Sequence, residues 1–127
     1  MKPKYHNKKC SYDGMTFDSK HERDRYCELR LLQKAGVISD LRCQVPFRLV
    51  PEQREPDGRG PRGGIRRGKI IEKAVDYVAD FVYVKNSQPY VNNGQTVVED
   101  AKGVRTKDYI IKRKLMLWLH GIRVQEV

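Results

Sequence analysis

The sequence has few cysteines, and they show no metal-binding or disulfide pattern. The cysteines form no Cys-x-x-Cys pair, and adding the histidines yields no zinc-ligand spacing. These residues are Cys10, Cys27, Cys43, His6, His21 and His120. An odd number of unpatterned thiols indicates free cysteines in a reducing compartment, and it argues against a zinc finger or a disulfide-stabilised secreted domain.

Long hydrophobic runs are also missing. No segment approaches the roughly 20 apolar residues that cross a membrane, and the polar N-terminus does not resemble a signal peptide. No internal repeat occurs, and 127 residues suit one compact domain. We therefore expect a single domain over residues 1–127 of a soluble, cytoplasmic protein with no membrane partner.

Acidic side chains are outnumbered. Lys and Arg total 26 against 16 Asp and Glu, which gives a formal charge of +10. Such a charge attracts polyanions over long distances, so nucleic acid is the leading partner. A solvated basic surface or a ribosomal-type scaffold remains an alternative that composition alone does not exclude.

Two segments carry the start and stop signals of helices. A capping-box pattern, Ser19-x-x-Glu22, opens a helix-forming stretch that ends at Ala35. A second helix is expected over 106–120, before Gly121. The apolar residues predicted for the core face of this second helix are Ile111, Leu115, Trp118 and Leu119.

Four segments have the character of strands. Residues 41–50 alternate, with Pro46 suggesting an edge strand or a bulge. The long run 70–84 is apolar on both faces near its end, which indicates a central strand. A third strand is expected over 96–102 and a short last one over 122–127. The predicted order is helix, three strands, helix, strand, which is an α/β fold.

Residues 54–69 differ in composition from the rest of the chain. Six cations are interleaved with five glycines and two prolines, so the segment cannot bury a core, and we expect a mobile loop or hairpin tip. It is interpreted as a basic arm that lies along phosphates, with a solvated linker as the alternative. The predicted nucleic-acid contacts are Lys8, Lys9, Arg59, Arg62, Arg66, Arg67, Lys69 and Lys107.

Two aspartates and a lysine are the candidates for chemistry. Asp80 lies inside an apolar strand, where an ionised carboxylate is costly unless it is paired or binds a metal. Asp100 and Lys102 are two residues apart on the next strand, so their side chains project to one face, whereas Glu99 points away. Two carboxylates suit Mg²⁺, and a neighbouring lysine can orient water or stabilise the transition state of phosphodiester hydrolysis.

The spacing alone is a weak signal. An acidic-x-Lys triplet occurs by chance about once in a chain of this size, and Asp18-Ser19-Lys20 fits it at a helix start. The strand context favours Asp100-Ala101-Lys102, while a structural ion-pair network remains the alternative. Glu22 also has two interpretations, a capping residue or a carboxylate that reaches the metal site, and the two are compatible.

Several motifs resemble a known class of nucleases. They are Phe17-Asp18-Ser19-Lys20-x-Glu22 with Arg25-Tyr26, then Ala79-Asp80-Phe81-Val82-Tyr83, then Val97-Val98-Glu99-Asp100-Ala101-Lys102-Gly103. Together they resemble the PD-(D/E)xK, restriction-endonuclease-like superfamily. Within it they are similar to a family of small phage-encoded endonucleases related to Holliday junction resolvases.

The resemblance implies an αβββαβ core with a mixed sheet of about four strands flanked by helices. It implies a Mg²⁺ cofactor, which Mn²⁺ could replace, no small-molecule cofactor, and cleavage that leaves 5′-phosphate and 3′-hydroxyl ends. The implied catalytic residues are Glu22, Asp80, Asp100 and Lys102, and the implied metal ligands are Glu22, Asp80, Asp100 and Ala101. Ala79 stands where the superfamily has its proline, and Asp100 stands where glutamate is more usual.

The leading hypothesis is a structure-selective endodeoxyribonuclease that cuts branched DNA in the host cytoplasm. Two symmetric nicks in a junction require a homodimer. Alternatives are a sequence-specific or mismatch-directed nuclease, and a non-catalytic nucleic-acid-binding protein in which Asp80 and Asp100 are salt-bridged. RNA as the substrate is a further alternative, because tyrosines can stack on bases; the candidates are Tyr5, Tyr12, Tyr77, Tyr83 and Tyr90.

Overall fold

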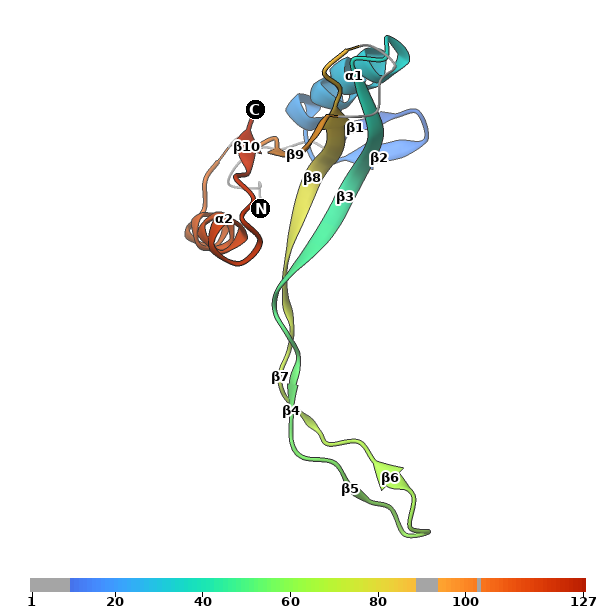
Figure 1. Cartoon of the computed structure of the whole chain (residues 1–127), viewed down its shortest axis with the longest axis vertical. Helices are drawn as coiled ribbons and strands as arrows, with labels where there is room; N and C mark the ends of the chain where they lie inside the picture. Colours follow the sequence, from blue (N-terminus) through green and yellow to red (C-terminus); the bar gives the residue numbers. More distant parts are fainter. Residues whose placement is uncertain (1–9, 89–93, 103) are drawn as a thin grey trace, which may run out of the picture.

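A computed structural model describes residues 10–88, 94–102 and 104–127, and it confirms the α/β class (Figure 1). The central sheet has the strand order β10-β9-β8-β3. These strands are β3 (Ile38–Val50), β8 (Val75–Lys85), β9 (Gln95–Asp100) and β10 (Gln125–Glu126). The β3–β8 and β8–β9 pairs are antiparallel and the β9–β10 pair is parallel, so the four-stranded sheet is mixed.

Sheet position explains the composition of the two long strands. β8 lies between β3 and β9, as its apolar faces predict. β3 is an edge strand, which accommodates Pro46 because proline has no N–H to donate and one side of an edge strand has no strand partner. The described helices include none that is long and apolar enough to cross a membrane.

The two helices begin and end at the predicted signals. Helix α1 (Lys20–Lys34) starts at Ser19, whose hydroxyl accepts from the Glu22 N–H, and it ends at Ala35. Helix α2 (Lys107–His120) is capped by the Thr106 hydroxyl and ends at Gly121. Gly121 has φ +67°, a left-handed conformation that glycine adopts without strain.

Two clusters of buried side chains hold the helices to the sheet. The cluster under α1 is built around Leu29 and Phe81. The cluster under α2 is built around Met116 and Val82. Since the sheet has apolar residues on both sides of β8, each helix covers a different part of it.

The predicted core face of α2 was wrong in part. Tyr109 and Met116 are the buried residues of this helix, whereas Ile111, Leu119 and above all Trp118, at 81% exposure, face outward. Leu115 is partly buried. The helix carries apolar residues on more than one side, so periodicity could not choose which side meets the sheet.

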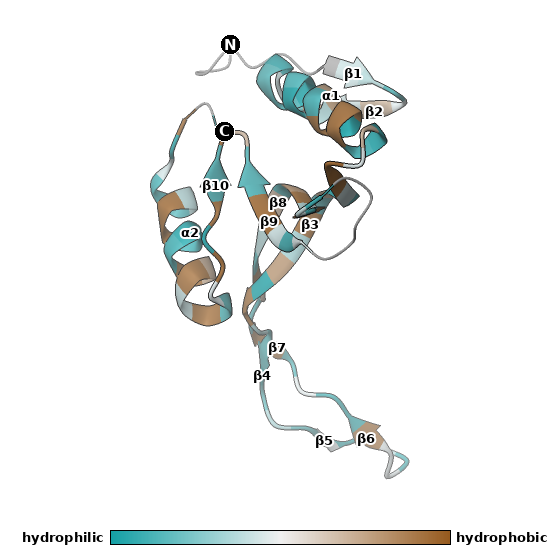
Figure 2. Cartoon of the chain, turned by 45° about the horizontal axis from the view of Figure 1, so that its top comes forward, coloured by the Kyte–Doolittle hydropathy of each residue, from teal (hydrophilic) through white to brown (hydrophobic). Residues whose placement is uncertain are grey.

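An extended hairpin arm continues β3 and β8 away from the body of the protein (Figures 1 and 2). Near the body, β4 (Gln53–Arg54) pairs with β7 (Ile70–Glu72). Further out, β5 (Gly58–Arg59) pairs with β6 (Ile65–Arg66). Residues 54–69, predicted as a loop or hairpin tip, thus form most of a two-stranded arm.

A short hairpin at the start of the described chain packs beside α1. It consists of β1 (Cys10–Tyr12) and β2 (Met15–Phe17), joined at Asp13 and Gly14. The Asp13 carboxylate forms an ion pair with Arg30 of α1. Phe17 is buried in the cluster under α1, so the hairpin is fixed from both ends.

Candidate functional site

Asp80 and Asp100 come together at one end of the β8–β9 pair. Phe81 pairs with Glu99, and the two aspartates are the next residues on each strand. Beyond this last pair, the Ala101 N–H donates to Asp80 Oδ2 at 2.8 Å. The register thus places the two aspartates opposite each other, and the charge of Asp80 contributes to the raised pKa of Asp100.

The Asp100 carboxyl group is fully buried, with 0% of the residue exposed. Its Oδ2 accepts from the Tyr77 hydroxyl at 2.6 Å, and its Oδ1 has no hydrogen-bond partner among the described residues. Burial raises the pKa of Asp100 to about 6; the Tyr77 hydrogen bond opposes this rise and the charge of Asp80 adds to it. A buried carboxylate oxygen without a hydrogen bond is costly, so a cation beside it is stabilised.

Lys102 lies beside this buried oxygen. β9 ends at Asp100, two residues earlier than predicted, yet Lys102 Nζ is 3.5 Å from Asp100 Oδ1. The same ammonium lies 5.3 Å from the centre of the Tyr109 ring on α2. The lysine and the carboxylate therefore lie together although the strand ends between them.

A hollow of about 230 Å³ opens next to Lys102. A second cationic side chain, Lys112 of α2, lines this hollow, and so does Thr106 at the start of that helix. The lining residues are Tyr77, Val78, Lys102, Thr106, Asp108, Tyr109 and Lys112. Two ammonium groups and a helix N-terminus are favourable surroundings for a phosphate group.

Glu22 approaches the aspartates from α1. It is 6% exposed, and its Oε1 accepts from Gln44 Nε2 at 3.0 Å. The same amide nitrogen lies 3.3 Å from Asp80 Oδ1, so Gln44 bridges the two carboxylates. Burial raises the pKa of Glu22 to about 7, and the charge of Asp80 is the next cause.

The backbone is irregular where Gln44 faces Asp80. The neighbouring pairs are Cys43 with Phe81 and Val45 with Ala79, which places Gln44 opposite Asp80. Gln44 has φ +53°, an uncommon conformation for a residue other than glycine. Along β8, Ala79 belongs to the cluster under α2 and Phe81 to the cluster under α1. Asp80 therefore lies where the two clusters meet.

Glu99 faces away from the aspartates, as the strand alternation predicts. It is buried and binds Arg25 of α1 through two hydrogen bonds, of 2.8 and 2.7 Å. The Tyr83 hydroxyl donates to the same carboxylate. Glu99 is thus held by partners on α1 and β8 and does not face Asp80 and Asp100.

The predicted nucleic-acid contacts fall in three places. Lys8 and Lys9 lie outside the described residues. Lys107 is exposed at the start of α2. The remaining five are exposed along the arm, namely Arg59, Arg62, Arg66, Arg67 and Lys69. The arm and the carboxylates are therefore separate parts of the molecule.

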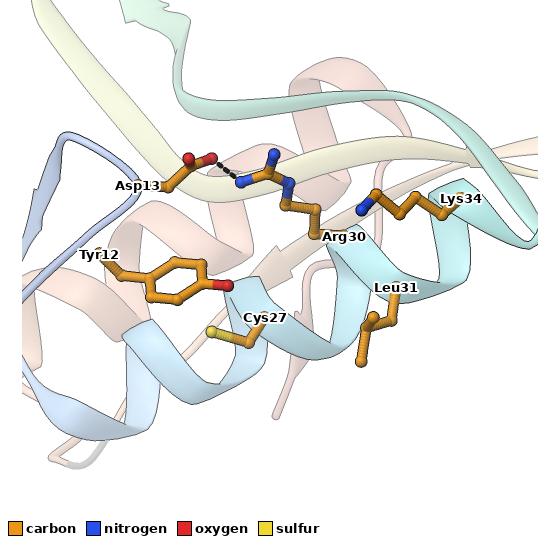
Figure 3. Close-up of a pocket in the computed structure, with 6 residues that line it drawn as sticks. All are labelled: Tyr12, Asp13, Cys27, Arg30, Leu31 and Lys34. Atoms are coloured by element: carbon orange, nitrogen blue, oxygen red, sulfur yellow. Dashed lines mark ion pairs between the residues drawn. The ribbon is translucent and has the colours of Figure 1, made fainter.

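Another hollow, of about 290 Å³, lies on the outer side of α1 (Figure 3). Tyr12 and Asp13 of the first hairpin and Cys27 of the helix line it, and the Asp13–Arg30 ion pair crosses it. Of the residues predicted to contact a ligand, only Tyr12, a candidate for base stacking, is among the described residues that line it. We regard it as the seam between the β1–β2 hairpin and α1.

The carboxylates suit a hard divalent cation such as Mg²⁺. Among residues 10–88, 94–102 and 104–127, no three His, Cys, Asp or Glu side chains are arranged to hold a metal ion by themselves. Mg²⁺ does not require such a cage, because it is usually bound by one or two carboxylates together with water and substrate phosphates. The Asp80–Asp100 pair fits that donor set: among the described residues Asp100 Oδ1 accepts no hydrogen bond, and its neighbour is the Lys102 ammonium.

Sequence reasoning missed three residues of the site. Gln44 gave no signal, because its role depends on the pairing of β3 with β8. Tyr77 lies on the same strand as Asp80 but bonds to Asp100 of the next strand. Lys112 could have been suspected only from its place one turn into α2, near the strand end that carries Lys102.

The fold and the site define a small α/β protein with two converging aspartates and an adjacent lysine at the end of a strand pair. Residues 2–122 match the family described as "Protein of unknown function (DUF1064)". Because this match covers almost the whole chain, the protein belongs to that family. No curated protein and no solved structure matches the chain.

Proposed function

We propose that this protein is a Mg²⁺-dependent endodeoxyribonuclease of the PD-(D/E)xK type that cuts branched DNA. The observation that carries the proposal is the convergence of Asp80 and Asp100 with Lys102, which forms an ion pair with Asp100 Oδ1. The Lys102–Asp100 ion pair by itself also fits a structural network, but the missing hydrogen bond on Asp100 Oδ1 among the described residues favours a site for a further cation. The +10 charge and the basic arm support a polyanionic substrate.

Each side chain has a distinct part in the proposed reaction. Asp80 and Asp100 would hold the cation, and a bound Mg²⁺ would supply an activated water and neutralise charge on the phosphate. Lys102 is placed to stabilise negative charge that develops on the phosphate oxygens. The raised pKa of Glu22, about 7, suits a group that accepts a proton near neutral pH.

Neighbouring residues would position this machinery. Tyr77 donates a hydrogen bond to Oδ2 of Asp100 and so fixes the orientation of the carboxylate, whose Oδ1 lies beside Lys102. Gln44 fixes the Glu22 and Asp80 carboxylates relative to each other. The hollow that contains Lys102 and Lys112 would receive a phosphate of the bound strand, which places the scissile bond beside the carboxylates.

Cutting a four-way junction calls for two active sites related by symmetry, so we propose a homodimer. The outward apolar side of α2, with Ile111, Trp118 and Leu119, is a suitable contact surface. Trp118→Lys should convert a dimer into a monomer in analytical ultracentrifugation while circular dichroism stays unchanged. A wild-type protein that is monomeric at micromolar concentration would contradict the dimer. We place the protein in the host cytoplasm, where such DNA occurs.

The experiment compares a synthetic four-way junction with a linear duplex of the same sequence, in Mg²⁺ or in EDTA. Wild type should place paired nicks in the junction only with Mg²⁺, and Mn²⁺ should substitute. The control variant Asp24→Asn, which changes an exposed carboxylate on α1, should cut the junction like wild type. Equal cutting of both substrates would retain the nuclease and remove the branch selectivity. Tight binding with no cutting in any divalent metal would favour the non-catalytic alternative.

A further inference from the structure

The tip of the arm carries apolar side chains that the rest of the chain leaves exposed. Ile65 on β6 is 76% exposed, and β6 pairs only with β5 in the described part of the chain. Pro61 is exposed in the adjoining turn. Both line a hollow of about 430 Å³ at the tip, together with Arg62 and Arg66. Apolar and cationic side chains thus share one surface far from the core.

The charge of the tip has one sign. Residues 58–69 contain five cations and no acidic residue. Carboxylates precede this segment: Glu52 pairs with Arg54 on the same side of the arm, and Asp57 accepts from the Gly68 N–H across it at 2.9 Å. A tip of this kind fits a narrow negative groove, because arginine is drawn into the minor groove of duplex DNA.

The tip is also thin. Gly63 adopts φ +82°, as a glycine readily does, and a side chain at Gly63 or Gly64 would meet nothing within 4 Å. The Gly60 N–H donates to the Gly64 carbonyl and the Gly63 N–H donates to the Gly60 carbonyl, which closes the turn. Residues 58–69 also lack the Asn, Gln, Asp and Glu side chains that read adenine and cytosine edges in the major groove.

We propose that residues 58–69 insert into the minor groove of duplex DNA, with Pro61 and Ile65 as wedges against a base step and Arg62 and Arg66 along the groove. Apolar wedges of this kind partly unstack the bases and bend the duplex. The inference rests on the proposed function in taking DNA as the ligand, but it does not depend on cleavage.

The length of the arm limits the distance between the carboxylates and the bend in the duplex. Strands rise about 3.3 Å per residue, so the chain from Gln44 to Pro61 spans at most about 55 Å. This corresponds to roughly one and a half turns of duplex, at about 34 Å per turn. The arm would therefore bend a duplex up to about 16 base pairs from the phosphate held at the carboxylates.

The experiment measures binding and bending of full-length protein in EDTA on three linear duplexes. Their central steps carry A·T, G·C or inosine·C pairs. Inosine removes the minor-groove amino group of guanine and leaves the major groove unchanged, so the two grooves are distinguished. Fluorescence energy transfer between end labels reports the bend. We expect the inosine duplex to behave like A·T, with affinity about fivefold or more above that of G·C.

Matched variants test the wedge. Ile65→Ala and Pro61→Ala should reduce both the bend and the preference, whereas Ile71→Ala, an exposed isoleucine (56%) on β7 near the base, should change neither. An inosine duplex that behaves like G·C would overturn the inference in favour of the major groove. A full bend with Ile65→Ala, or no duplex binding at all, would also overturn it. Bending without junction cleavage would leave the inference standing and remove the proposed nuclease.

Discussion

Replacing Glu22 by glutamine should change the free energy of unfolding in a way that depends on pH. The Glu22 carboxyl has a pKa of about 7 in the folded protein, against an ordinary value of 4.5, because it is buried and lies near Asp80. One pKa unit corresponds to about 1.4 kcal/mol. The gap between the two values therefore makes the ionised Glu22 a destabilising group of about 3 kcal/mol at pH 8.

The sign follows from proton binding. A carboxyl group whose pKa is raised on folding binds its proton more tightly in the folded state, so the wild type loses stability as pH rises from about 4.5 to 7. Below pH 4.5 both states are protonated and the effect is absent. Glutamine carries no charge, and its amide oxygen still accepts from Gln44. The variant should therefore be about 3 kcal/mol more stable than wild type at pH 8, and equally stable at pH 4.

Urea unfolding in EDTA buffers at pH 4 and pH 8 measures this difference. Asp24→Asn, an exposed change on the same helix, should alter stability by less than about 0.5 kcal/mol at both pH values. Added Mg²⁺ should stabilise the wild type at pH 8 more than Glu22→Gln. A variant that is destabilised at pH 8, or that differs from wild type equally at both pH values, would refute a raised pKa of Glu22 beside Asp80.

Three further predictions concern the site and the arm. Lys102→Ala should bind junction DNA normally and cut it at least about a hundredfold more slowly in single-turnover assays; weak binding with normal turnover would assign Lys102 to phosphate contact alone. Tyr77→Phe removes a hydrogen bond to a charged group, worth about 1.5–3 kcal/mol, so the acid limb of the pH–rate profile should move up by about one to two pH units. An unmoved limb would remove Tyr77 from the positioning role. Deleting residues 58–68 removes four arginines and should lower the salt slope of binding by about 3 to 4; an unchanged slope would contradict the arm's phosphate contacts.

Local signals predicted much of the fold. Ser19, Thr106 and Gly121 marked helix ends that the structure confirms, because capping depends on neighbouring residues. The run around Asp80 is apolar on both faces, and this pattern predicted the central position of β8. Alternation predicted correctly that Glu99 points away from Asp100, although its bond to Arg25, 74 residues away, could not be foreseen.

The rest depends on contacts between distant segments. α2 is apolar on several sides, and only packing against the sheet decides that Met116 is buried and Trp118 is exposed. Gln44 enters the site through the register of β3 on β8 and its left-handed backbone. The arm segment has little apolar character, which predicted a mobile loop or hairpin tip; the structure has a hairpin whose two short strand pairs, β4–β7 and β5–β6, depend on contacts between its two sides.

The central claim is that Asp80 and Asp100 form a catalytic cation site. The most direct test is single-turnover cleavage of a bound four-way junction by Asp100→Asn, which keeps the shape of the buried side chain, beside wild type and Asp24→Asn. We predict a loss of at least about a hundredfold in cleavage rate at saturating protein, with the Kd for the junction in EDTA unchanged. Cleavage by Asp100→Asn within a few-fold of wild type would contradict the claim.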